Sequence, residues 1–202
     1  MNNLRRQHRQ QGDSDVSTYI DVLSYLVNKR DPDGVDLYYL NSPRKYKSCK
    51  SSKTLSDSVR VQVFAGLSNP ETRLRPIIET YCEKLVEYNA KRRYSEYASP
   101  RGSLGRSFRK PPKLPRPLNL YVLTDGVWES PNDVGPDPGY LVAQIEKLIQ
   151  HLKAADCDRQ QVGIQFIRFG NHQYGIQRLE ALDQLGGEER NGLYVNPFPI
   201  SP

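Results

Sequence analysis

The sequence contains few of the residues that build disulfide frameworks, zinc sites or membrane spans. Only 3 cysteines and 3 histidines occur among 202 residues, and no CxxC or Cys/His spacing connects them. No run of about 18 apolar residues is present, which argues against a transmembrane helix. The polar amino terminus lacks an apolar core of signal-peptide length. We therefore expect an intracellular, cytoplasmic protein with reduced thiols and no transmembrane segment.

Motifs of common enzyme classes are missing as well. No glycine-rich phosphate loop follows a predicted strand, and no GxSxG elbow occurs. Cys82 lies on the apolar face of a predicted helix, where a thiol usually serves as a small core residue. His151 and His172 have no acidic residue placed beside them by the sequence. These absences predict that the protein is not an enzyme.

Positive charge is concentrated in two segments. The formal net charge is +6, yet residues 91–117 carry nine basic residues against the single acid Glu96, and residues 1–12 add three arginines. The rest of the chain is therefore net acidic. Because residues 91–117 are also rich in serine, proline and glycine, we predict a disordered basic insertion there. It interrupts a single α/β domain over residues 17–198, which a disordered tail of residues 1–16 precedes.

The basic insertion offers an alternative function. A flexible cationic arm would bind the phosphate groups of nucleic acid or of an anionic membrane. Its proline-rich end, residues 111–117, could instead adopt a polyproline II helix and occupy an aromatic groove. The cations that would contact phosphate are Lys91, Arg92, Arg93, Arg106, Arg109 and Lys110.

Outside the insertion, helical and strand patterns alternate. Apolar periodicity predicts helices over residues 19–27, 74–85, 140–152 and 176–185. Runs of β-branched and aromatic residues predict strands over 35–40, over 119–124 and over 162–169. Alternation at Val59, Val61 and Val63 predicts an edge strand, although Leu55 and Val59 would also suit a helix. Strands separated by helices imply parallel crossovers, so the expected fold is a doubly wound, Rossmann-like α/β sheet with helices on both faces.

The strongest candidate site follows the strand that ends at Asp125. Asp125 and Gly126 place a carboxylate and a sharp turn at the carboxyl end of this strand. In open parallel sheets, ligands bind beyond the carboxyl ends of the strands. An Asp-Gly pair is also ordinary turn chemistry, so a site and a simple turn both stay open. Trp128, close behind, could form part of a partner-binding surface or be buried.

Four segments, taken in order, resemble a von Willebrand factor A domain of the kind common in fungal proteins. They are DPDGVDLYYLNS at residues 31–42, SNPETRL at 68–74, NLYVLTDG at 119–126, and QVGIQFIRFGN with RLEALDQL between 161 and 185. The resemblance implies a doubly wound sheet that carries a metal-ion-dependent adhesion site. Mg²⁺, which prefers hard oxygen ligands, would occupy that site and bind an acidic side chain of a protein partner.

The resemblance also assigns candidate ligands. Asp125 matches the strand-ending aspartate of the family. Ser68 occupies the usual place of the second-loop threonine, and Thr72 is a nearby substitute. Glu71 stands where the family has glycine, so it could coordinate the metal, contact the partner or stabilise the helix amino terminus.

The first strand of the family, with its DxSxS motif, has no counterpart here. Asp13 to Ser17 spells DxDxS, but no apolar strand precedes it and the next strand follows too soon. We therefore expect an amino-terminally truncated domain in which Mg²⁺ binding is weak or absent. In the family this strand is central, so its loss would expose two apolar strand edges unless they pair with each other or with another chain.

Overall fold

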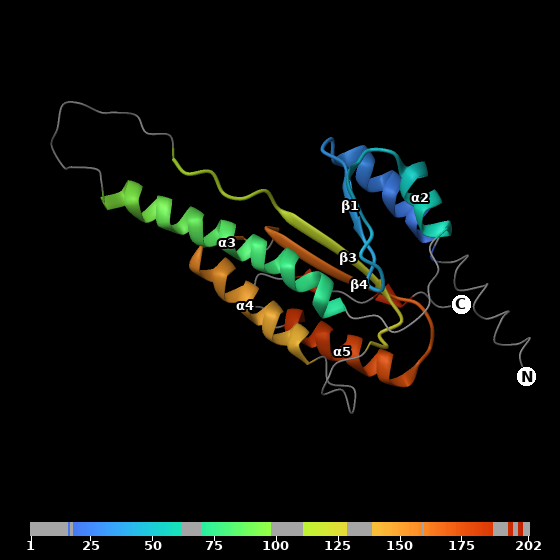
Figure 1. Cartoon of the computed structure of the whole chain (residues 1–202). Coiled ribbons are helices and arrows are strands. Elements are labelled where there is room, and N and C mark those ends of the chain that lie inside the picture. The colour runs from blue at the N-terminus through green and yellow to red at the C-terminus, as the bar shows by residue number, and fades with distance from the viewer. Residues whose placement is uncertain are drawn as a thin grey trace, which may run out of the picture.

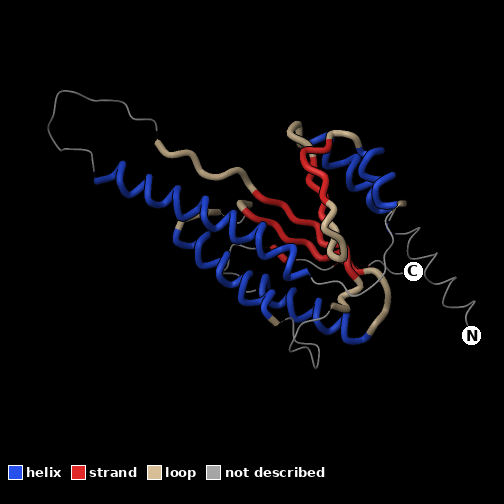
Figure 2. Tube along the Cα trace, in the orientation of Figure 1, coloured by secondary structure: helices blue, strands red, loops and turns tan. Residues whose placement is uncertain are grey.

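A computed structural model of the chain describes residues 16, 18–61, 70–97, 111–128, 139–158, 160–187, 194–195 and 198–199. These residues form a mixed α/β structure in which a short parallel sheet packs against three helices (Figure 1). A smaller group of two helices and a strand hairpin, residues 16–61, lies beside one end of the sheet and is called the amino-terminal unit (Figure 2). None of the described helices is long and apolar enough to cross a lipid bilayer.

The parallel sheet is built on two long strands. β3 (Leu118–Thr124) and β4 (Val162–Arg168) pair in parallel over their full length. β4 also pairs in parallel with two short strands, β5 (Tyr194–Val195) and β6 (Phe198–Pro199). A helix, α4 (Tyr140–Ala154), separates β3 from β4. The predicted parallel crossover between these two strands is therefore confirmed.

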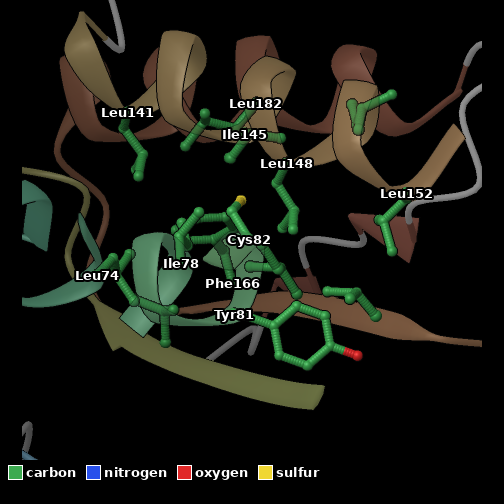
Figure 3. Packing of buried hydrophobic residues seen from close by; sticks show 14 of the residues in the cluster. Leu74, Ile78, Tyr81, Cys82, Leu141, Ile145, Leu148, Leu152, Phe166 and Leu182 are labelled. Atoms are coloured by element: carbon green, nitrogen blue, oxygen red, sulfur yellow. The ribbon is translucent and has the colours of Figure 1, made fainter. Parts of the chain in front are cut away.

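The main core lies between this sheet and the helices α3 (Pro70–Tyr97), α4 and α5 (Gln173–Gly187). Alternate residues of β4 point into it, and Phe166 is fully buried at its centre (Figure 3). Helical spacing brings apolar residues of all three helices onto the same cluster. These are Leu74, Ile78, Tyr81, Cys82 and Leu85 from α3, Leu141, Ile145, Leu148, Ile149 and Leu152 from α4, and Leu179 and Leu182 from α5.

The three helices share one cluster with the inward-facing residues of β3 and β4, so they cover the same face of the sheet. On the opposite face of β3, Asn119 and Tyr121 are exposed. The α/β class is thus confirmed, whereas the prediction of helices on both faces is not borne out by the described helices α3 to α5. Both crossovers of the described sheet, β3–α4–β4 and β4–α5–β5, return along this one side.

The amino-terminal unit contains a helix over residues 18–30, a hairpin and a second helix. The hairpin consists of β1 (Val35–Tyr38) and β2 (Lys45–Cys49), which pair antiparallel. The helix α2 (Ser52–Arg60) begins after Ser51, whose side chain accepts a hydrogen bond from the Thr54 N–H at 3.2 Å.

The predicted edge strand around Val59 is wrong, because residues 52–60 form α2. Leu55 and Val59, four residues apart, face the same way on this helix and are each only 2% exposed. The alternation of valines that suggested a strand stops at Val61, which follows the helix and is exposed. Val63 lies outside the described residues.

The basic segment also differs from its prediction. Residues 91–97 continue α3 as regular helix, and residues 111–117 lead directly into β3. The prediction of disorder is therefore wrong for residues 91–97, which are helical. Residues 98–110, like the predicted tail of residues 1–15, lie outside the described part of the chain.

Among the described residues, the amino-terminal unit contacts the rest of the molecule at several points. Leu123 of β3 packs on the small core of Ile20, Tyr39, Leu55 and Val59. The rings of Tyr19 and Phe169 meet edge to face, 6.0 Å apart. Arg116, just before β3, forms ion pairs with Asp31 and Asp33 in the turn before β1. The hydrogen bond from Arg116 is the main reason that the pKa of Asp31 is lowered.

Candidate functional site

The described residues that follow β3, 125–128, are called the Asp125 loop and display the Asp125 carboxylate at the carboxyl end of the parallel sheet. Asp125 is exposed, and its Oδ1 accepts a hydrogen bond from the Val127 N–H at 2.9 Å. The preceding Thr124 is buried, and its hydroxyl accepts the Gly126 N–H at 3.1 Å. These two side-chain-to-backbone bonds define the turn in which Asp125 sits. The carboxylate is therefore both a turn residue and a group that a ligand can reach.

Two glycines allow α5 to approach this loop closely. Gly126 has a φ of 76°, and a Cβ placed on it would lie 2.5 Å from the carbonyl oxygen of Gly175. A Cβ on Gly175 would lie 2.2 Å from the carbonyl oxygen of Asp125. Neither position has room for a side chain, so the close contact depends on both residues being glycine.

Replacing Gly175 with alanine is expected to destabilise the protein, although alanine is the better helix former by about 1 kcal/mol. The added Cβ must push the Asp125 carbonyl away, and overpacking of this kind costs about 1–3 kcal/mol. Urea unfolding measures the change, with Gln177→Ala as the control, because residue 177 is exposed on the same helix. Equal stability of Gly175→Ala and the wild type would show that the loop adjusts without cost.

Arg178 holds the same loop from α5. Its side chain is buried, and it donates hydrogen bonds to the carbonyl oxygens of Gly126 at 2.9 Å and Trp128 at 3.4 Å. The guanidinium also lies 4.8 Å from the ring centroid of Trp128. The contact with the two glycines and the bonds from Arg178 together fix the loop that carries Asp125.

Trp128 itself belongs to the main core and is only 6% exposed. Of the two roles expected for this ring, burial in the core is the one that the structure shows. Its apolar ring packs against the helices and is covered on one side by Arg178, which leaves little of it for a partner.

The remaining metal-ligand candidates lie near the start of α3. Thr72 is exposed and Glu71 is half-buried in the first turn of this helix, which begins at the end of the sheet where β3 finishes (Figure 1). Ser68 lies outside the described residues. No group of three or more His, Cys, Asp or Glu side chains suited to a metal ion occurs among the described residues. Any metal at Asp125 would thus have at most two such side chains as ligands among the described residues, with hydroxyl groups and water completing its coordination.

Several cations of the predicted arm make internal contacts. Lys91 forms an ion pair with Glu87 at 2.6 Å. Arg92 donates to the Ala155 carbonyl at 3.2 Å and lies 5.8 Å from the ring centroid of Tyr88. Arg93 is exposed, whereas Arg106, Arg109 and Lys110 lie outside the described residues.

A shallow groove between α3 and α4 brings Cys82 and His151 to one place. Three glutamates of α3, at positions 79, 83 and 87, line the same groove together with Lys147. Cys82 is buried, however, and burial raises the pKa of its thiol, which keeps it protonated near neutral pH. The predicted role of Cys82 as a core residue is confirmed by its place in the main cluster.

Sequence reasoning had missed the contribution of α5 to the Asp125 loop. A signal for it was present. Gly175, Arg178, Leu179 and Leu182 follow helical spacing on one face, so an arginine and a glycine replace apolar residues on a buried stripe. Such a pattern indicates a close contact, but not which loop makes it.

Comparisons of the chain with family models, curated proteins and solved structures found no match. The site itself and the segments that resemble a von Willebrand factor A domain are therefore the features that bear on function.

Proposed function

We propose that this chain is a protein-interaction module of the von Willebrand factor A type, whose contact point is the Asp125 loop. The observation that carries the proposal is an exposed carboxylate at the carboxyl end of a parallel strand, on a loop fixed by a neighbouring helix. The order of elements supports this proposal. β3 ends just before Asp125 and is followed by α4, β4 and α5, which is the order that the resemblance implies.

We further propose that Mg²⁺ binds weakly at this loop. Asp125 supplies one carboxylate, while Thr72 and Glu71 at the start of α3 supply oxygen atoms from the same end of the molecule. Mg²⁺ keeps several waters and needs only one or two carboxylates, so this set is chemically suitable. When bound, the ion would supply positive charge for an acidic side chain of the partner. Weak binding follows because the sequence has no first-loop DxSxS ligands.

Internal contacts of three described cations support this function over an electrostatic arm for nucleic acid or membranes. Lys91, Arg92 and Arg116 each contact a carboxylate or a backbone carbonyl of the protein itself. A cation that is already paired contributes less to counterion release on a polyanion.

Thermal unfolding with excess Mg²⁺ and with a chelator tests the metal site. At ten times its dissociation constant, Mg²⁺ should add about 1.4 kcal/mol to the unfolding free energy, which raises Tm by roughly 3–6 °C for a domain of this size. The shift should disappear in Asp125→Ala. Asp158→Ala is the matched control, because Asp158 is also exposed and accepts a backbone N–H two residues on, from Gln160 at 2.9 Å.

The control separates metal binding from loss of the turn. Asp158→Ala removes the same kind of hydrogen bond and should keep the Mg²⁺ shift. A cooperative transition that is indifferent to Mg²⁺ in the wild type would overturn the metal site. An equal shift in wild type and Asp125→Ala would place the ion elsewhere.

A further inference from the structure

Among the described strands, β3 stands at an edge of its sheet, and its outer backbone groups have no described strand as a partner. The bonds from the Leu118 N–H to Gln161 and from the Phe169 N–H to Thr124 show that even-numbered residues of β3 turn their backbone groups toward β4. Asn119 and Tyr121 therefore turn theirs toward the other edge. In the described part of the chain, no strand pairs with β3 on that side.

The two strands of the hairpin carry features that discourage further pairing. β2 displays two exposed lysines, Lys45 and Lys47. β1 carries the exposed Asp36 and a register irregularity between Val35 and Leu37. Charges and bulges of this kind are how proteins protect sheet edges.

β3 has none of this protection. Its sequence, LNLYVLT, contains no charge and no proline, and its ladder with β4 runs without a bulge. Tyr121 is 42% exposed in the middle of the strand. The first half of β3 lies away from β1 in the chain trace (Figure 2). β3 therefore has the composition of an interior strand but stands at an edge, which predicts that another strand pairs with it.

We propose that the occupant is β3 of a second copy of this chain, paired antiparallel across a two-fold axis. In this register Asn119 of each copy lies opposite Tyr121 of the other, so the two-fold axis generates two such residue pairs. Within each pair, the outward N–H and C=O groups of Asn119 form hydrogen bonds with those of Tyr121. A second copy fits best because it carries the same unpaired edge, and because an uncharged strand meets no like charge when it pairs with itself. The result is one continuous sheet through both molecules.

The charge of the chain adds a diagnostic feature. Two copies with a formal charge of +6 each repel one another, and salt screens that repulsion. Salt should therefore strengthen the dimer. Binding to a polyanion would instead weaken as salt rises.

Sedimentation and light scattering of the full chain over a range of concentrations test the proposal. The wild type should approach twice the monomer mass of 23.1 kDa. Tyr121→Lys places a charge on the pairing edge, and Asn119→Pro removes an N–H that the partner needs, so both should remain monomeric and folded. Tyr94→Lys makes the same chemical change at an exposed site on α3 and should still dimerise.

Three results would overturn the proposal: a wild type that stays monomeric, a dimer that survives both β3 variants, or an open-ended series of larger species. If both variants unfold, hydrogen exchange of the wild type shows whether this edge of β3 forms the dimer. The Asn119 and Tyr121 amides should gain protection with increasing concentration, and their failure to do so excludes this edge. Asp125→Ala should dimerise normally, which keeps this test separate from that of the metal site.

Discussion

Replacing Arg178 with methionine is expected to release the Asp125 loop and to destabilise the protein. Methionine keeps much of the apolar stem but cannot donate to the Gly126 and Trp128 carbonyls, which Arg178 bonds at 2.9 and 3.4 Å. Each of the two buried carbonyls that loses its donor costs about 1–3 kcal/mol, so the unfolding free energy should fall by roughly 2–6 kcal/mol. Chemical denaturation measures this change.

Trp128 reports directly on the loop because it is the only tryptophan of the chain. In Arg178→Met its emission should shift to longer wavelength as water reaches the ring. Gln177→Met is the control, since residue 177 is an exposed neighbour on the same helix. Unchanged emission and stability in Arg178→Met would show that the glycine contact alone holds the loop.

Truncation of Phe166 to alanine should cause the largest loss of stability in the main core. Phe166 is fully buried on β4 among residues from α3, α4 and α5. Removing a buried phenylalanine ring costs about 3–5 kcal/mol, from lost transfer free energy and from the cavity left behind. The midpoint of urea unfolding should fall accordingly, with little change in its slope.

Tyr94→Ala provides the comparison for Phe166→Ala. Tyr94 is 65% exposed on α3, so truncating it removes little buried surface. Its effect should stay close to that of an ordinary surface substitution, within about 0.5 kcal/mol. Similar losses for the two variants would mean that the helices do not close over β4 as described.

A rigid loop gives the Asp125 carboxylate a defined position without a partner. Arg178 and the contact between Gly126 and Gly175 order the backbone before any ligand arrives. A partner that binds there therefore loses little additional conformational freedom in the loop. The same rigidity explains why variants of α5, some distance along the sequence, are expected to act on the proposed site.

Local patterns in the sequence were sufficient for the elements of the main core. The apolar run before Asp125 and the alternation around Phe166 predicted β3 and β4, and helical spacing predicted α3, α4 and α5. These patterns are reliable because strand and helix periods place apolar residues on a single face. The strand prediction at Val59 was wrong because apolar residues there fit both the two-residue spacing of a strand and the four-residue spacing of a helix. In the folded chain, Leu55 and Val59 of the helix pack in one cluster with Tyr39.

The sequence by itself determined the α/β class, the parallel pairing of β3 with β4 and the position of Asp125 at a strand end. Only the tertiary structure decided that Trp128 is buried, that Arg178 and Gly175 fix the Asp125 loop, and that β3 stands at the edge of the described sheet. The first group depends on residues close together in the chain. The second group depends on contacts between segments about 50 residues apart in the sequence, such as Arg178 with Gly126. Local hydrophobic periodicity predicts which face of an element is buried, but not which distant backbone a side chain will contact.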